Sequence, residues 1–352
     1  MPKISIVTPC YNAERFLGAL IESILCQEFT DWEFVIVDDG STDGSRALAE
    51  TYAAQDLRIQ VVSQPNGGVS KARNIGFKNL KNASDYVYFL DADDVVDPKF
   101  FQVIIQYLDS HPEVGMVHTG HYLIGDDGEL LPTQYEHVMG LPRLGIVNGR
   151  VCNIPASNPK TTIEAILGNA GIVPSISIFR RDIYEQTPGF DEDFGQPYED
   201  SDIFLHMAIR SEIHYLPDKL LLYRRHSSQN TAGNPDAERF NYLEGQRARL
   251  ITKWMGLRGF LPEQQLRLDE ALLNYQTMIV AHQGFSQAAS FWQKGRFLKA
   301  FHFWGGGIRR WLRRRRCSPA RKIAGSQPAT EISCSIARGS RESFTHTVAP
   351  DV

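Results

Sequence analysis

The chain has 352 residues, 42% of them apolar and 22% charged, which is the composition of a globular protein with a large core. Its formal net charge of −4 gives no sign of a nucleic-acid partner, and we expect none. The five cysteines form no Cys-x-x-Cys pair, which argues against a disulfide framework or a cysteine zinc site and favours a reducing compartment. A strand begins directly at the N-terminus and no apolar run reaches about 18 residues, which predicts a cytoplasmic protein without a signal peptide or membrane-spanning helix.

Strands and helices alternate from residue 4 to residue 90. Apolar, largely β-branched runs predict strands at 4–8, 33–37, 59–62 and 86–90. Apolar residues at helical spacing predict helices at 14–28, 45–54 and 70–80, with Asn12 capping the first and Ser41 or Asp43 the second. This alternation is typical of a parallel sheet with helices on both faces. We therefore predict an α/β protein with a doubly wound, mostly parallel sheet, which binds its ligands at the carboxyl ends of the strands.

Three polar clusters follow these strands, at residues 8–11, 38–39 and 91–94. Each alone could be ordinary loop chemistry, but parallel strands bring all three to one edge of the sheet, which favours a nucleotide pocket. In that pocket Tyr11 could stack on a base, and Asp39 could accept a hydrogen bond from a base N–H. Asp91 and Asp93, two residues apart on an extended strand, could hold a ribose and a divalent cation. A solvated turn rich in aspartate is the alternative.

The second half of the chain predicts strands at 114–118 and 175–179 and helices at 100–110 and 161–167. Residues 125–160, rich in Gly, Pro and Asn, are interpreted as an insertion or a long loop. The acidic segment 198–202 precedes a predicted helix at 203–209. Acids at a helix start are favoured by the helix dipole, so capping is one interpretation of this segment, and a catalytic carboxylate is the other.

The sequence changes character from residue 235 onward. Long helices are predicted at 237–254 and 263–290, with no strand between them. Residues 308–316 contain six arginines in nine residues, together with Trp311 and Leu312, which favours an interfacial helix on an anionic membrane surface. A solvated basic segment or an RNA-binding arm is the alternative. Residues 317–352, rich in Ser, Ala, Thr and Arg, are predicted to be disordered.

Four motifs occur in order along the first part of the chain: IVTPCYN at 6–12, VDDGSTD at 37–43, NGGVSKARNIG at 66–76 and LDADD at 90–94. Together with the Tyr-Arg-x-His segment at 223–226, they resemble the family 2 glycosyltransferases, which have the GT-A nucleotide-sugar fold. The resemblance covers about residues 1–228. It implies nucleotide-sugar contacts from Thr8, Pro9, Tyr11 and Asp39, and it places Arg73 near the base and phosphates.

The resemblance also implies roles for the acidic residues. Asp91 would meet the ribose, and Asp93 would bind Mg²⁺ or Mn²⁺ on the donor diphosphate, with His226 as a further metal ligand. Asp200 would be the general base, and Glu199 would orient it or meet the acceptor. Asp202 is interpreted as an acid of the helix turn. An ordinary structural role is the alternative for His226.

The sequence thus predicts a metal-dependent, inverting transferase of the hexosyl type. It would move a sugar from a nucleoside-diphosphate sugar, a UDP-sugar foremost, to a hydroxyl of a cell-surface glycan or a lipid-linked precursor. The predicted parts are a catalytic domain at 1–230, a helical extension at 235–316 and a tail at 317–352, with the Arg-rich segment holding the protein on the inner face of the plasma membrane. A catalytically inactive nucleotide- or glycan-binding protein on the same fold is the alternative. A nucleotidyltransferase is disfavoured because no Gly-rich phosphate loop follows the first strand.

Overall fold

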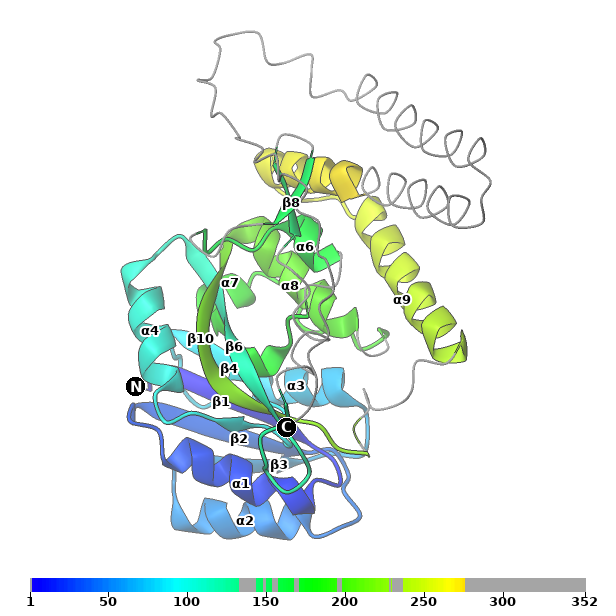
Figure 1. Ribbon diagram of the computed structural model, residues 1–352. Coiled ribbons are helices and arrows are strands. Elements are labelled where there is room, and N and C mark those ends of the chain that lie inside the picture. Colours follow the sequence, from blue (N-terminus) through cyan, green and yellow to red (C-terminus); the bar gives the residue numbers. More distant parts are fainter. Residues whose placement is uncertain are drawn as a thin grey trace, which may run out of the picture.

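The computed structural model of the protein shows an α/β fold built on one eight-stranded sheet (Figure 1). The structure describes residues 2–132, 144–147, 150–153, 158–167, 171–194, 198–227, 229 and 237–275. The strands lie in the order β3-β2-β1-β4-β9-β6-β10-β5. Their bounds are Ile4–Cys10 for β1, Trp32–Asp38 for β2, Ile59–Ser63 for β3, Tyr86–Phe89 for β4, Val95–Val96 for β5, Val114–Ile124 for β6, Ser177–Arg180 for β9 and Glu212–Arg224 for β10.

Parallel pairing dominates the sheet. β3, β2, β1 and β4 are mutually parallel, and so are β6 and β10. β9 lies between β4 and β6 and is antiparallel to both, and the short β5 pairs antiparallel with β10. A separate hairpin of β7 (Leu144–Val147) and β8 (Arg150–Asn153) lies within the stretch predicted as a loop. The predicted α/β class with a mostly parallel, doubly wound sheet is confirmed.

Helices cover both faces of the sheet (Figure 1). On one face α1 (Glu14–Leu25) and α4 (Phe100–Ser110) share an apolar core with β1, β2 and β4, and α2 (Ser45–Gln55) packs beside α1. On the other face α6 (Ile163–Leu167), α8 (Tyr198–Arg210) and α9 (Ala237–Gly256) share a second core. α3 (Val69–Lys78) lies against β1 and β2, and α7 (Arg181–Tyr184) follows β9.

The first two helices hold each other's N-termini. Asp43 accepts hydrogen bonds from the backbone N–H groups of Glu14 at 3.2 Å and Ser45 at 3.0 Å, so one carboxylate serves the start of both helices. The predicted cap at Asn12 is wrong. Asn12 has a φ of +50°, and its side chain accepts a hydrogen bond from the N–H of Thr42 at 2.8 Å, because Asp43 already occupies the start of α1.

Two element boundaries differ from the prediction in ways that matter for the site. β4 ends at Phe89, so Asp91 and Asp93 lie in a turn after the strand and not on the strand itself. α8 begins at Tyr198, so the acidic segment forms the first turns of the helix and does not precede it. The helix dipole favours these acids where they stand, which makes the early start of the helix physically reasonable.

Residues 237–275 pack against the side of the sheet that carries α8. Leu250 and Trp254 of α9 are buried in the core that contains α8, as are Leu268 and Tyr275 of the helical stretch 262–275. The predicted division of the chain at residues 230–235 stays a prediction, and the segments 308–316 and 317–352 lie outside the described residues. Within the part of the chain that the structure describes, each helix is too short or too polar to cross a membrane.

Candidate active site

A cavity of about 550 Å³ opens at the carboxyl ends of β1, β2 and β4. This is the edge of the sheet at which ligands bind in open α/β folds. Six of the predicted site residues line it: Pro9, Tyr11, Asp39, Asp91, Asp93 and His226. Phe16 and Gln229 also line it, and no motif in the sequence marks either of them. The cavity therefore gathers residues from the first strand turn to the end of β10.

The turn after β1 forms one wall of the cavity. Tyr11 is 51% exposed, so its ring is accessible for stacking on a planar group. Pro9 lies beside it in the same wall. Thr8 does not line the cavity, because its side chain is fully buried within β1. Its position therefore gives no support to the predicted contact with a nucleotide.

Asp39 holds the glycine loop that faces the turn after β1. Its Oδ1 accepts hydrogen bonds from the Gln64 side chain at 2.6 Å and from the N–H of Gly67 at 2.8 Å, and its Oδ2 accepts one from the N–H of Gly68 at 2.8 Å. A carboxylate has about four acceptor positions, so one on Oδ2 remains for a ligand. Gly68 has a φ of +87°, a conformation that favours glycine, which explains the residue type at the start of α3.

Arg73 on α3 connects the cavity to α8. Its guanidinium donates to Asp91 at 2.7 Å and to Asp200 at 2.9 Å, and Glu199 lies 3.7 Å away. The side chain is 2% exposed and lies over the ring of Phe190. Arg73 itself does not line the cavity and meets it through Asp91. The planar fork of arginine holds its two carboxylate partners at fixed angles, a geometry that the flexible ammonium of lysine does not impose.

Three carboxyl groups surround this one guanidinium, so the cluster has an excess of acid. Burial, followed by the neighbouring Glu199 carboxylate, raises the pKa of Asp200 well above its usual range, and Arg73 opposes this only in part. Burial disfavours the charged form of Arg73, but the carboxylates outweigh burial and raise its pKa. Asp200 is thus a largely enclosed carboxyl, with 13% of its side chain exposed, and its pKa is strongly raised, a property that catalytic acids and bases share.

Asp93 and His226 contact each other on the wall of the cavity. His226 Nε2 lies 2.9 Å from Asp93 Oδ2, and the imidazole packs against the ring of Phe16 with ring centroids 4.6 Å apart. Both Asp93 and His226 line the cavity. The contact joins the turn after β4 to the end of β10, which are 133 positions apart in the chain.

Arg224 and Asp94 fix this pair, and sequence reasoning assigned no role to either. The N–H of Arg224 donates to Asp94 at 3.0 Å, and the guanidinium donates to the carbonyl of Asp93 at 2.9 Å and to the carbonyls of Gly125 and Asp126. Burial raises the pKa of Asp94 well above its usual range, followed by the effect of the adjacent carboxylates. Arg224 belongs to the Tyr-Arg-x-His segment, so the sequence motif could have indicated it. It lies two residues before His226 and contacts the turn that carries Asp93.

The donor set at Asp93 and His226 fits a divalent cation that is shared with a substrate. Within the described residues, no cluster of three or more His, Cys, Asp or Glu side chains could hold an ion by itself. Mg²⁺ sites commonly use one or two carboxylates and take their other ligands from substrate phosphates and water. An open pair of one carboxylate and one imidazole on a cavity wall is compatible with that arrangement.

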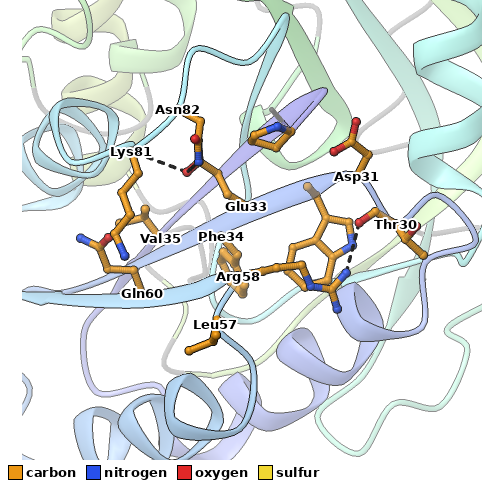
Figure 2. A pocket seen from close by; sticks show the side chains of 12 residues that line it. Thr30, Asp31, Glu33, Phe34, Val35, Leu57, Arg58, Gln60, Lys81 and Asn82 are labelled. Carbon is orange, nitrogen blue, oxygen red and sulfur yellow. Dashed lines mark hydrogen bonds between the residues drawn. The ribbon is translucent and has the colours of Figure 1, made fainter.

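A second cavity of about 310 Å³ lies at the opposite, amino-terminal ends of β2 and β3 (Figure 2). Several of its polar side chains make hydrogen bonds to neighbouring residues. Glu33 accepts a hydrogen bond from the Asn82 side chain at 2.9 Å, and the Arg58 guanidinium donates to the carbonyl of Thr30 (Figure 2). The same guanidinium lies over the ring of Trp32, 3.6 Å from its centroid. These contacts hold loops to the sheet, which is sufficient to explain the residues there.

Comparison with curated proteins identifies glycosyltransferases as relatives. The uncharacterized glycosyltransferase EpsJ of Bacillus subtilis is 38% identical over 137 residues, which cover 39% of this chain and 39% of EpsJ. The glycosyltransferase GlyG of Streptococcus pneumoniae is 27% identical over 230 residues, covering 64% of this chain and 71% of GlyG. The chain therefore spans less than half the length of EpsJ, and the similarity to EpsJ concerns that part alone.

Solved structures have the same fold. Residues 1–349 of Staphylococcus aureus TarS, in complex with UDP-GlcNAc, match with a TM-score of 0.56 and 18% identity over 89% of this chain and 81% of that one. The mannosyltransferase PcManGT of Pyrobaculum calidifontis, in complex with GDP-Man and Mn²⁺, matches with a TM-score of 0.52 and 16% identity over 89% and 85%. The predicted GT-A fold is confirmed. The model of glycosyl transferase family 2 matches residues 5–187, more than half of the sequence, and the chain belongs to this family.

Proposed function

We propose that the protein is a metal-dependent, inverting glycosyltransferase that moves a hexose from a nucleoside-diphosphate sugar to an acceptor hydroxyl. The observation that supports this most is the Arg73 bridge. It joins Asp91, on the wall of the cavity, to Asp200, a largely enclosed carboxyl with a raised pKa on α8. A donor site and a candidate base are thereby held in one rigid cluster, which is what a displacement at the sugar carbon needs.

The donor nucleotide is proposed to fill the cavity at the ends of β1, β2 and β4. Tyr11 would stack on the base, and the remaining acceptor position of Asp39 would take a base N–H. Asp91 would accept hydrogen bonds from the ribose hydroxyls. Asp93 and His226 would hold Mg²⁺ or Mn²⁺ against the diphosphate, and the bound cation would stabilise the negative charge that the leaving group gains.

Asp200 is proposed to be the general base. In its ionised form it would take the proton of the acceptor hydroxyl while that oxygen attacks the anomeric carbon and the nucleoside diphosphate leaves from the opposite face, which inverts the configuration. A raised pKa makes Asp200 a stronger base than an ordinary aspartate. Glu199, beside it in the first turn of α8, would orient the acceptor or the base.

A UDP-sugar is the donor that we propose first. TarS has been solved with UDP-GlcNAc, whereas PcManGT has been solved with GDP-Man and Mn²⁺, so the fold accommodates more than one base. For the acceptor we propose a cell-surface glycan or a lipid-linked precursor, in a pathway of polysaccharide biosynthesis for the cell envelope. The sequence 308–316, with its six arginines, would bring the cytoplasmic enzyme to the inner face of the membrane that carries such an acceptor.

A thermal-shift screen tests the donor site. UDP, GDP, dTDP and CMP are each added with Mn²⁺ or with EDTA, and a ligand at 100 times its Kd adds about 2.7 kcal/mol to the free energy of unfolding. We expect stabilisation by one nucleoside diphosphate, UDP foremost, that is lost with EDTA. Asp93→Asn is the matched variant, since it removes a metal ligand and should lose the Mn²⁺-dependent part only. No shift with any nucleotide contradicts the proposed function.

A further inference from the structure

Two residues of α9 donate hydrogen bonds to the Asp202 side chain on α8. Its Oδ1 accepts a hydrogen bond from the indole N–H of Trp254 at 2.8 Å, and its Oδ2 accepts one from the ammonium of Lys253 at 2.8 Å. Asp202 and Trp254 are fully buried. Lys253 also donates to Asp191 at 2.7 Å, in the turn that precedes α8. Both oxygens of a buried carboxylate are therefore satisfied by two neighbouring residues of one helix.

This contact is specific, because a buried carboxylate is costly without its partners. Burial raises the pKa of Asp202, and the contacts with Lys253 and Trp254 oppose that rise. The indole of Trp254 also packs on His206, one turn further along α8, with ring centroids 4.6 Å apart. α9 thus contacts α8 through a polar anchor and an aromatic anchor at two successive turns.

Asp202 and Asp200 point to opposite sides of α8. At 3.6 residues per turn, two positions differ by about 200° around the helix axis. On one side Arg73 of α3 binds Asp200, and on the other side α9 binds Asp202. The helix is therefore clamped between α3 and α9, and its rotation about its own axis is fixed at the turn that carries the acids.

We propose that Asp202, with Lys253 and Trp254, is a positioning site for the catalytic base, so that α9 is part of the catalytic unit. This inference rests on the proposed function, in which Asp200 is the base. Without the contact from α9, the first turn of α8 can rotate or fray, and Asp200 loses its alignment with Arg73. A displacement of about 1 Å at a reacting group can reduce the rate about a hundredfold.

Steady-state kinetics of full-length variants test the proposal. Lys253→Met removes the ammonium but keeps the aliphatic stem, and Trp254→Phe removes the indole N–H but keeps an aromatic ring. We expect each to lower kcat about tenfold to a hundredfold while the donor KM stays within about twofold, because the donor cavity is not touched. Lys253→Arg restores the charge and should recover most of kcat. Arg249→Met is the matched control, since Arg249 and Lys253 lie over the same Phe194 ring and only Lys253 reaches Asp202.

Amide hydrogen exchange of residues 198–202 measures, without any substrate, how strongly the contact with α9 stabilises the first turn of α8. Lys253→Met should accelerate exchange there relative to Arg249→Met and leave β1 and β2 unchanged. Unchanged exchange and wild-type kcat in both Lys253→Met and Trp254→Phe overturn the positioning role. A loss of kcat that Lys253→Arg does not restore, or an equal rise in donor KM, also overturns it. Failure of the proposed function has a different signature, in which the wild type transfers no sugar while exchange at 198–202 still depends on Lys253.

Discussion

Arg73 holds three carboxyl groups that come from two distant parts of the chain. Asp91 follows β4, and Glu199 and Asp200 begin α8. At the residue scale this guanidinium decides whether the acids can be close together, because carboxylates without a cation would repel one another in a buried site. The residue that opposes the rise in the pKa of Asp200, the proposed base, is therefore the same residue that connects Asp200 to the cavity.

Arg73→Met should destabilise the protein strongly. Removing one partner of a buried charge pair costs about 3–5 kcal/mol, because here the buried Glu199 and the largely enclosed Asp200 are left without a cation. Urea unfolding at neutral pH measures the loss. Arg46→Met is the control, since the ion pair of Arg46 with Glu50 is on the surface and should contribute little. Equal stability of the two variants contradicts the role given to Arg73.

The loss in Arg73→Met should also depend on pH. The pKa of Asp200 is already raised in the folded wild type by burial and by Glu199, and the variant lacks the guanidinium that opposes the rise. The folded variant then binds more protons than the unfolded chain between their two pKa values, so its stability falls as the pH rises through that window. Unfolding measured at pH 5 and pH 8 should show the larger deficit at pH 8. A deficit that is equal at both values contradicts this account.

The sequence predicts the residues of the site better than their partners. The motifs marked Asp39, Arg73 and Asp200, because each motif is local in sequence. They do not show that Arg73 and Asp200 form a hydrogen-bonded ion pair, since these residues are 127 positions apart and their contact depends on how α3 and α8 pack. Asp202 was interpreted as a helix-turn acid for the same reason, because its partners on α9 are about 50 positions away.

At the element scale, the close packing of α3 on β1 and β2 determines where Arg73 lies. A Cβ atom added at Gly76 would lie 2.3 Å from Val7 of β1 and 3.0 Å from Val37 of β2. Both valines are buried strand residues that cannot move aside easily. A glycine is therefore required where α3 crosses the two strands, one turn after Arg73.

Gly76→Ala should destabilise the protein by about 1–3 kcal/mol through overpacking, although alanine favours helix. Gly245→Ala is the matched control, because Gly245 lies in α9 with open space around its Cβ position. That substitution should stabilise the protein by about 0.5–1 kcal/mol through helix propensity. Thermal unfolding of both variants gives the two signs. Stabilisation by Gly76→Ala contradicts the close packing of α3.

Apolar periodicity predicts those helices and strands whose structure follows from their local sequence alone. α1 was predicted because Leu17, Leu20 and Ile24 repeat at helical spacing and are buried in the structure. The strand β10 is not predicted, because exposed residues at its centre interrupt its apolar pattern. Its pairing with β6 defines it as a strand in the structure. The sequence predicts extended geometry for Asp91 and Asp93 as well as for strand 86–90, because the apolar run of β4 does not itself show where pairing with β1 ends.

For the whole molecule, the sheet explains why distant motifs form one site. Parallel β1, β2 and β4 direct their carboxyl ends to one edge, where the cavity opens. α/β alternation is local and is therefore readable from the sequence. The positions of β9, β10 and α9 in the fold cannot be predicted in the same way. The insertion of β9 between β4 and β6, and the packing of α9 on the second core, depend on contacts between residues far apart in the sequence.

Transfer activity of Asp200→Asn tests the central claim most directly. Asparagine has the shape of aspartate and can still accept a hydrogen bond from Arg73, but it cannot take a proton. We predict that the variant keeps its stabilisation by the nucleoside diphosphate and Mn²⁺ while transfer to the acceptor falls by about 10²–10⁴-fold, the usual contribution of a general base. Asp218→Asn, at an exposed position of β10, is the control and should transfer at the wild-type rate. Wild-type transfer by Asp200→Asn would contradict the assignment of Asp200 as the base.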